Sequence, residues 1–208
     1  TVSNSGRGTD NATLVFTDSK EETGAFFQSR GVVAWSNSGS PVSWFDPVST
    51  GRVWSSQWSI RASEELHTYT NLRNGSGDPC RLIGYSQKYV NTQISGGDVP
   101  DNGIWRLPKA REYVLYGFIT ENKVGNWSNG WNFNNGKFLP ASGTRRAAAG
   151  QLDDSGVVGY YGVSDYFTIV DDFGKKYWGM GILVESDGVT HRSAHHSASG
   201  FQIRCVRQ

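Results

Sequence analysis

Several features that commonly reveal a protein's partner are scarce in this sequence. Methionine occurs once and cysteine twice in 208 residues, and the formal net charge is only +1. The chain therefore lacks the excess of basic residues that favours binding to nucleic acids or anionic lipids. No apolar run approaches the roughly 20 residues that a membrane-spanning helix needs. We therefore expect neither a nucleic-acid partner nor a membrane span.

Motifs for common catalytic and cofactor sites are also missing. The sequence contains no G-x-S-x-G nucleophile elbow. Gly156, Gly159 and Gly162 do not form a G-x-G-x-x-G phosphate cradle ahead of a helix. Serine, histidine and aspartate are so plentiful that their occurrence together carries little information. We therefore expect a protein that is not an enzyme, with no catalytic residue and no cofactor.

Glycine and aromatic residues are abundant instead. The 26 glycines are about twice an average share, and eight tryptophans supply material for a packed core. The length suits one domain over residues 1–208, with an N-terminal extension of about residues 1–76. Cys80 and Cys205 fit either one disulfide or two buried thiols, and the glycine-, asparagine- and serine-rich composition suits an exported protein.

Local patterns predict two short helices among strands. Asp78 followed by Pro79 is typical of a helix start, which predicts a helix from Pro79 to about Val90. A second helix is expected from Lys109 to about Phe118, with Gly117 near its end. Strands are expected at 12–17, 31–35, 156–163, 176–184 and 201–206. The predicted class is α+β, with a loop-rich antiparallel sheet.

Two kinds of candidate metal site occur, and we favour neither. His191, His195 and His196 are suitable ligands for a transition metal, but no cysteine or acid in their segment completes a site. The pairs 153–154 and 171–172 are adjacent aspartates that could bind Ca²⁺, although such pairs are more often solvated turns. We therefore predict no metal.

Five motifs, in chain order, resemble the formylglycine-generating-enzyme-like branch of the C-type lectin folds. Residues 103–108 (GIWRLP) with Glu112 are similar to its GWRLPT-x-x-EW signature, and residues 136–143 (GKFLPASG) to its F-L-P-A-x-G stretch. Residues 159–161 (GYY) and 200–207 (GFQIRCVR) are similar to two of its later strands. Residues 77–80 (GDPC) match an element of Bacteroidetes surface proteins of the major-paralogous-domain type.

The resemblance implies a C-type lectin-like fold, with two short helices and a small antiparallel sheet, in an extracellular protein of a cell surface or pilus tip. The oxidase branch holds copper with two cysteines near the end, but the position five before Cys205 is Gly200. Cys80 is therefore implied as the disulfide partner of Cys205. The calcium-dependent sugar-binding branch uses E-P-N or Q-P-D and W-N-D elements, which the chain lacks.

A third branch, the variable proteins diversified by retroelements, displays a variable surface on its closing strands. The resemblance to it implies a monomeric, non-enzymatic adhesin whose partner is a host or microbial surface protein or glycan. The alternatives are a structural pilus-tip subunit that contacts other pilus subunits, and an oxidase. The implied ligand-binding residues come from two segments of the C-terminal part: Tyr161, Asp165, Tyr166, Phe167, Tyr177, Trp178, His191, Ser193, His195, His196, Ser197 and Ser199.

Overall fold

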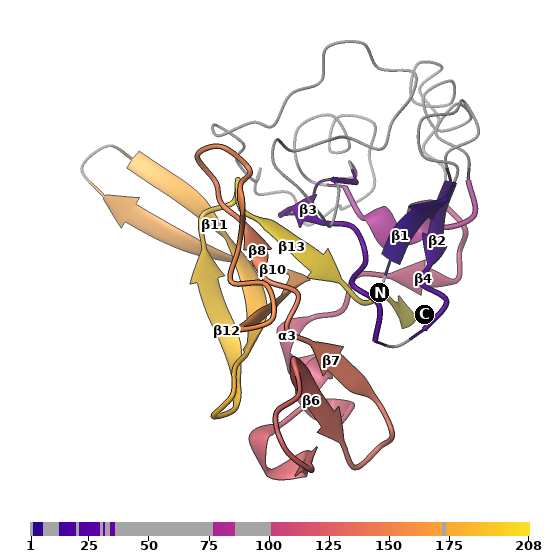
Figure 1. Ribbon diagram of the computed structural model, residues 1–208. Coiled ribbons are helices and arrows are strands. Elements are labelled where there is room, and N and C mark those ends of the chain that lie inside the picture. The colour runs from indigo at the N-terminus through magenta and orange to yellow at the C-terminus, as the bar shows by residue number, and fades with distance from the viewer. Residues whose placement is uncertain are drawn as a thin grey trace.

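A computed structural model describes residues 2–5, 13–19, 21–29, 31, 34–35, 77–85, 101–171 and 174–208 (Figure 1). Its elements are β1 Val2–Ser5, β2 Thr13–Phe16, β3 Phe27–Gln28, η1 Pro79–Leu82, β4 Trp105–Arg106, α3 Ala110–Leu115, η2 Thr120–Asn122, β5 Lys123–Val124, β6 Gly130–Phe133, β7 Phe138–Pro140, β8 Thr144–Arg145, β9 Leu152–Asp153, β10 Gly159–Asp171, β11 Gly174–Val184, β12 Val189–His195, β13 Gly200–Ile203 and β14 Val206–Arg207.

A curled, seven-stranded mixed sheet forms the centre of the fold. Its strand order is β12-β11-β10-β13-β8-β9, and β3 also pairs with β13. Strands β10 and β11 form a long antiparallel hairpin, and only its base pairs with β12 and β13 within the described residues. The outer half of the hairpin projects beyond the other strands (Figure 1). Smaller sheets join β1 with β2, β4 with β14, and β5 and β7 with β6.

The predicted α+β, C-type lectin-like fold is wrong. The described chain is mostly β, with one α-helix, and the sheet is mixed because β10 pairs with β13 in parallel. The helix predicted from Pro79 starts there, with Asp78 as its cap, but is a single 3-10 turn that ends at Leu82. Gly84 follows with a φ of 90°, a left-handed conformation that ends a right-handed helix. Residues 86–90 lie outside the described part.

The second predicted helix exists but is shorter than expected. Helix α3 covers six residues, Ala110–Leu115, inside the predicted span that begins at Lys109. Gly117, with a φ of 81°, reverses the chain after the helix, as the sequence predicted. Two of its six residues, Ala110 and Tyr113, are buried. This short helix therefore serves mainly to turn aromatic side chains toward the sheet.

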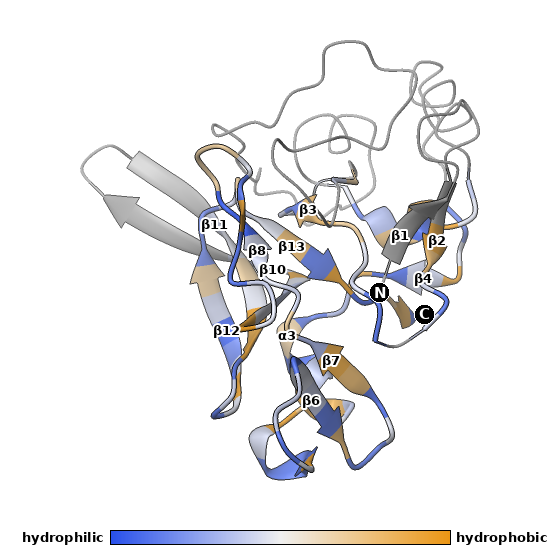
Figure 2. Ribbon diagram, viewed as in Figure 1, coloured by the Kyte–Doolittle hydropathy of each residue, from blue (hydrophilic) through white to orange (hydrophobic). Residues whose placement is uncertain are grey.

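Two apolar clusters fill the interior. One lies under α3 and contains Tyr113, Phe118 and Tyr161 among its members. The other surrounds Cys80 and Ile203. Strand β13 (GFQI) contains one strongly hydrophilic residue, Gln202, and Figure 2 shows a hydrophilic stretch in this strand. Gln202 is fully buried; its amide nitrogen donates a 2.9 Å hydrogen bond to the Gly24 carbonyl oxygen, whereas its amide oxygen has no hydrogen-bond partner among the described residues.

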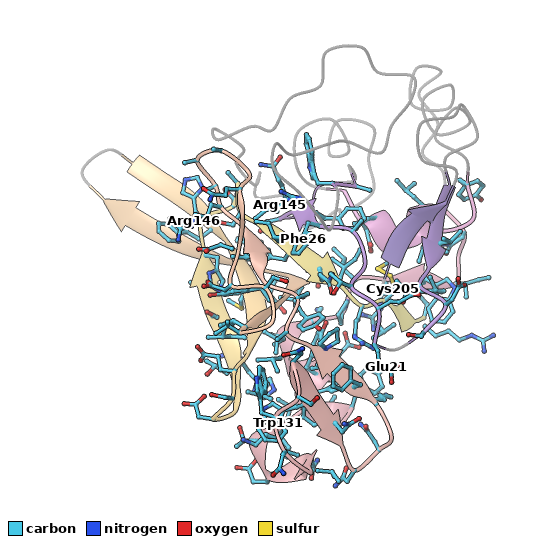
Figure 3. The ribbon with its side chains drawn as sticks, in the orientation of Figure 1. Glu21, Phe26, Trp131, Arg145, Arg146 and Cys205 are labelled. Carbon is cyan, nitrogen blue, oxygen red and sulfur yellow. A yellow bond between two sulfur atoms is a disulfide. The ribbon has the colours of Figure 1, made fainter. Side chains whose placement is uncertain are left out.

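Buried polar contacts also tie distant segments together. Asp78 is fully buried, and its carboxylate accepts hydrogen bonds from the backbone N–H groups of Cys80 and Leu107 at 3.0 Å. Arg145 is fully buried and donates to the Gly150 carbonyl oxygen at 2.7 Å, with its guanidinium 5.8 Å from the ring centroid of Phe26 (Figure 3). These contacts position β4, β8 and the N-terminal segment on the body.

A disulfide joins Cys80 of η1 to Cys205, which directly precedes β14. The structure therefore confirms the predicted pairing and excludes two free thiols. A disulfide is typical of proteins from oxidising, extracytoplasmic compartments. No described helix has both the length and the apolar content needed to cross a bilayer.

Candidate functional site

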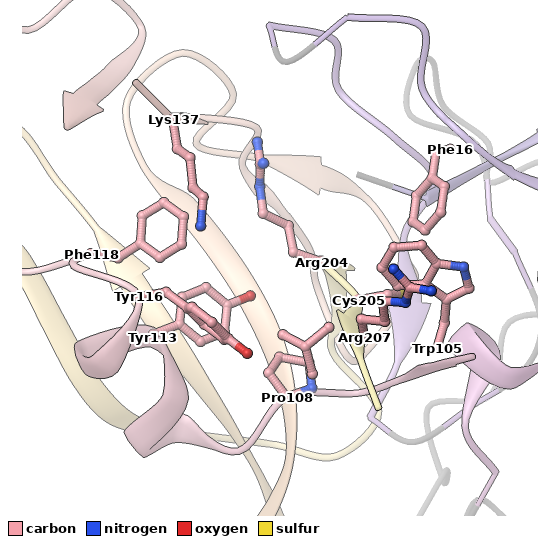
Figure 4. Close-up of a pocket in the computed structure, with 11 residues that line it drawn as sticks. Phe16, Trp105, Pro108, Tyr113, Tyr116, Phe118, Lys137, Arg204, Cys205 and Arg207 are labelled. Atoms are coloured by element: carbon pink, nitrogen blue, oxygen red, sulfur yellow. The ribbon is translucent and has the colours of Figure 1, made fainter. Parts of the chain in front are cut away.

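An open groove of about 460 Å³ lies between the α3 segment and the β4–β14 sheet. Eleven described residues line it (Figure 4). Five are aromatic: Phe16, Trp105, Tyr113, Tyr116 and Phe118. Three are basic: Lys137, Arg204 and Arg207. The others are Pro108, Val206 and Cys205, whose sulfur is in the disulfide.

One wall of the groove comes from the end of α3. The chain reverses at Gly117, so Phe118 packs back against Tyr113 with ring centroids 5.6 Å apart. Phe118 also contacts Phe133 edge-on at 5.1 Å, which anchors the turn in the core. Tyr116 stays 41% exposed because it lies on the outside of this turn. The wall is therefore a rigid aromatic surface with one accessible ring.

The opposite wall is built by residues far apart in the sequence. Trp105 of β4 pairs with Arg207 of β14, and Phe16 of β2 meets the Trp105 ring edge-on at 4.9 Å. The disulfide at Cys205 fixes the start of β14 to η1. Figure 4 shows Phe16, Trp105 and Arg207 at one end of the groove and the tyrosines at the other.

The groove is positively charged. The Lys137 ammonium lies 5.0 Å from the ring centroid of Tyr116 and 5.3 Å from that of Phe118. Arg204 donates to the Phe138 carbonyl oxygen at 2.5 Å, which fixes its guanidinium near the middle of the groove (Figure 4). No acidic residue occurs among the described residues that line the groove. Its three basic side chains therefore make the described lining of the groove positively charged.

The nearest acidic side chain on α3 is neutralised by an ion pair. Glu112 binds both terminal nitrogens of Arg106, at 2.6 and 2.7 Å. This hydrogen bonding is the main reason that the pKa of Glu112 lies below its ordinary value. Two parallel hydrogen bonds of this kind are strong and fix both side chains in orientation. Glu112 therefore does not cancel the charge of the groove.

A buried hydroxyl adds a further polar feature. Tyr113 is only 2% exposed, and its hydroxyl has no hydrogen-bond partner within the part of the chain that the structure describes. Burial raises the pKa of this phenol well above its ordinary value, against the opposing effect of the Arg204 charge. In Figure 4 the hydroxyls of Tyr113 and Tyr116 both point toward the middle of the groove. Buried donors without partners are uncommon in folded proteins.

The predicted ligand-binding residues lie elsewhere, and several have structural contacts. Tyr161 is fully buried and donates to the Pro140 carbonyl oxygen at 2.6 Å, so it is core and not surface. Asp165 accepts a 2.6 Å hydrogen bond from the backbone N–H of Ala110, the first residue of α3. His191 makes a 2.8 Å hydrogen bond with the Phe118 carbonyl oxygen. Asp165 and His191 thus hold the two ends of the α3 segment against the sheet.

The residues of β12 alternate between the two faces of the strand. His191, Ser193 and His195 are half-buried, and the residues between them are exposed. Arg192, with a φ of 67°, is an extra residue at a bulge opposite β11. A bulge leaves one residue unpaired and changes the local twist. The three predicted residues of β12 are therefore directed toward the body.

The other predicted residues fall into two small clusters. His195 lies between Tyr160 and Phe201, with ring centroids at 4.9 and 5.2 Å, and its burial lowers its pKa. Trp178 meets His196 edge-on at 5.9 Å, and this pair is accessible.

The residues that follow His196 form a tight turn. Ser197 is buried, and its carbonyl oxygen accepts from the backbone N–H of Ser29. Ser199 is half-buried and its N–H donates to the His196 carbonyl oxygen, while Tyr166 is half-buried opposite Gly179. The side chains of Phe167 and Tyr177 lie outside the described part. Among the described residues, no three His, Cys, Asp or Glu side chains gather to hold a metal ion.

Sequence reasoning missed the groove because its lining residues come from separate parts of the chain. A local signal was present in the run from Tyr113 to Phe118, which has four large apolar or aromatic residues beside Gly117 on a helix too short to bury them all. The contributions of Phe16, Lys137 and Arg204 had no local signal.

Comparison with known proteins finds no relative of this chain. No family model, no curated protein and no solved structure matches the chain.

Proposed function

We propose that this protein is an extracellular, non-enzymatic binding domain and that the groove is its ligand-binding site. The observation that carries the proposal is the lining of the groove, which combines five aromatic rings with three cationic side chains. It holds no histidine, carboxylate, serine or free thiol among its described residues, so the side chains that most often act as nucleophile or general base are missing from its described lining. Recognition without covalent chemistry fits this composition best.

The size and composition of the groove support binding of a ligand. Its volume of about 460 Å³ is within the range of about 300–1,000 Å³ that is usual for small-molecule sites. Such sites are lined mainly by apolar and aromatic groups with a few polar side chains. The disulfide and the packed aromatic walls hold the site in shape before a ligand arrives, which limits the entropy lost on binding.

The proposed site, like the one predicted from the sequence, uses residues near the C-terminus, but these residues come later in the chain. The groove uses residues 204–207, after β13, in place of β12 and the turn at 196–199. It does not depend on a C-type lectin-like fold. A host or microbial surface protein or glycan as the partner stays a prediction from the sequence. Display at a cell surface or pilus tip stays a prediction from the sequence.

Two single substitutions of exposed aromatic side chains test which surface binds. Tyr116→Ala removes an exposed aromatic ring of the groove, and His196→Ala removes the exposed imidazole beside Trp178. The wild-type chain and both variants are compared on an array of neutral, sialylated and sulfated glycans and immobilised extracellular proteins, with thermal melts as a folding control. We expect Tyr116→Ala to weaken binding at least about tenfold, since aromatic anchors dominate binding energy, and His196→Ala to leave it within about twofold.

The reverse pattern would assign binding to the β12 face and refute the groove as the site. Full binding by both variants, or binding of neither an array probe nor a small organic anion by the wild-type chain, would also refute the proposal. Because Tyr116 is 41% exposed and lies outside the regular helix, its replacement should change the melting temperature little.

A further inference from the structure

The polar groups of the groove are almost all hydrogen-bond donors. The side chains of Lys137, Arg204 and Arg207 carry donors and no acceptor, and the Trp105 indole donates only. The hydroxyls of Tyr113 and Tyr116 are the two side-chain groups of the described lining that can also accept. No Asp, Glu, Asn, Gln, Ser or Thr lines the groove within the described residues.

The shortage of side-chain acceptors in the groove disfavours a ligand that carries many hydrogen-bond donors. A neutral saccharide carries several hydroxyls, each of which must donate to an acceptor or lose a hydrogen bond that it made to water. The groove has too few side-chain acceptors to satisfy them. A ligand whose polar atoms are all acceptors would instead match the side chains of Lys137, Arg207 and Trp105.

The positive charge of the groove lining restricts the class of ligand further. Lys137 holds its ammonium over the rings of Tyr116 and Phe118, and Arg204 is fixed by the Phe138 carbonyl group. Hydrogen bonds from such cations to an ionised acceptor are about twice as strong as neutral ones. An anionic acceptor group, a carboxylate above all, is therefore favoured over a neutral carbonyl group.

The aromatic walls of the groove indicate the shape of the apolar part of the ligand. The Tyr116 and Phe118 rings lie on one side and the Trp105 and Phe16 rings on the other, with the cationic groups between and above them (Figure 4). A planar apolar ring fits between such walls because aromatic faces and edges pack well with one another. Tyr113 is 2% exposed, and its buried hydroxyl has no hydrogen-bond partner among the described residues and points toward the same space. It is a donor that an acceptor oxygen of a ligand would satisfy.

From these observations we infer that the groove recognises a small apolar organic anion, an aromatic or alicyclic ring that bears a carboxylate. The carboxylate lies toward Lys137 and Arg204, and the ring lies between the aromatic walls. This inference rests on the proposed function and names its ligand class. The groove is of small-molecule size, whereas a specific protein interface buries on the order of 800 Å² on each partner.

Matched small-molecule probes test the charge and the apolar ring separately. Wild-type full-length chain is titrated by isothermal calorimetry with 2-naphthoate, with its neutral amide 2-naphthamide, and with glucuronate, an anion rich in hydroxyl donors. We expect 2-naphthoate to bind most tightly, with at least about tenfold weaker binding of the amide, which corresponds to loss of one charge-assisted hydrogen bond. Glucuronate is expected to bind at least about tenfold more weakly than 2-naphthoate, because its hydroxyls find few acceptors.

Lysine variants provide the matched control. Lys137→Gln should weaken 2-naphthoate binding about five- to tenfold, and Lys137→Arg should restore it to within about threefold. Lys123 also lies over an aromatic ring, Trp131 at 4.3 Å, but does not line the groove. Lys123→Gln should therefore leave binding unchanged.

Each contrary result has a distinct meaning. Equal binding of 2-naphthoate and its amide, or an unchanged affinity of Lys137→Gln, would overturn the anionic part of the inference. Glucuronate binding as tightly as 2-naphthoate would overturn the apolar part. If none of these probes binds while Tyr116→Ala still abolishes binding on the array, the ligand class is wrong and the proposed function stands. If Tyr116→Ala has no effect on the array, the proposed function itself is wrong.

Discussion

The disulfide should be the largest single contribution to the stability of this protein. It closes a loop across a sequence separation of 125 residues. In the chain-entropy model a loop of that length stabilises the folded state by about 5 kcal/mol, because it restricts the unfolded chain. Cys80 is also fully buried in one of the two apolar clusters, so its removal leaves unfilled volume in the core.

The double substitution Cys80→Ala with Cys205→Ala measures this contribution. For a chain of this length, 1 kcal/mol corresponds to about 2–4 °C in the melting temperature. We therefore expect the variant to melt about 10–20 °C below the oxidised wild-type protein. Because Cys205 leads into β14, the variant should also bind 2-naphthoate more weakly than the wild-type protein, through loosening of the wall that holds Arg207.

Thermal unfolding followed by circular dichroism provides the measurement. Intact-mass spectrometry with and without reductant first establishes that the two thiols are oxidised in the purified protein. Wild-type protein melted with reductant should approach the melting temperature of the variant. A decrease of less than about 3 °C would refute the reasoning, because it would correspond to less than about 1–2 kcal/mol.

Three further predictions concern stability, each measured by urea denaturation. Burial raises the pKa of Asp78 from 3.8 to about 6, so the folded state binds more protons than the unfolded chain, and the free energy of unfolding should fall by about 2–3 kcal/mol as the pH rises from 4 to 6. Asp78→Asn should remove this pH dependence, and a variant that keeps it would contradict the prediction. Glu112→Gln should lower the free energy of unfolding by about 1–2 kcal/mol at pH 7. Because hydrogen bonding to Arg106 lowers the pKa of Glu112, this difference between variant and wild type should vanish as the pH falls below that pKa. A difference that persists at pH 2 would argue against the ion pair. Gly143→Ala should lower the free energy of unfolding by about 3 kcal/mol or more, since its Cβ would lie 2.2 Å from the Asp153 carbonyl oxygen. Gly136→Ala, at a φ of 75° but in open space, should lower it by about 1 kcal/mol. Equal losses for the two variants would contradict the predicted clash.

Local features of the fold were predictable where short-range chemistry decides them. Asp78 and Pro79 marked the start of η1, and Gly117 marked the end of α3, because caps and left-handed glycines act within a few residues. The strand candidates at 156–163, 176–184 and 201–206 all appear as strands. The helix after Pro79 was overestimated because Gly84 was not recognised as a terminator.

The fold class was wrong for a different reason. Resemblance of short motifs carried the prediction of a C-type lectin-like fold, and motifs of four to eight residues specify local turns and strands, not strand order. The parallel pairing of β10 with β13, and the addition of β3 to β13, join segments separated by more than 40 and 170 residues respectively. Such pairings depend on long-range packing, for which a single sequence contains little direct signal.

The sequence by itself limited any internal disulfide to one pairing, since only two cysteines exist, and it determined the absence of a net charge that would favour nucleic acids. It also determined the local turns and most of the later strands. Only the tertiary structure decided the binding surface, because Phe16, Trp105, Tyr116, Lys137 and Arg204 come together through the disulfide, the turn at Gly117 and the antiparallel pairing of β4 with β14. A groove of this kind is a property of side chains distant in sequence, and its charge and donor pattern emerge only when folding places them side by side.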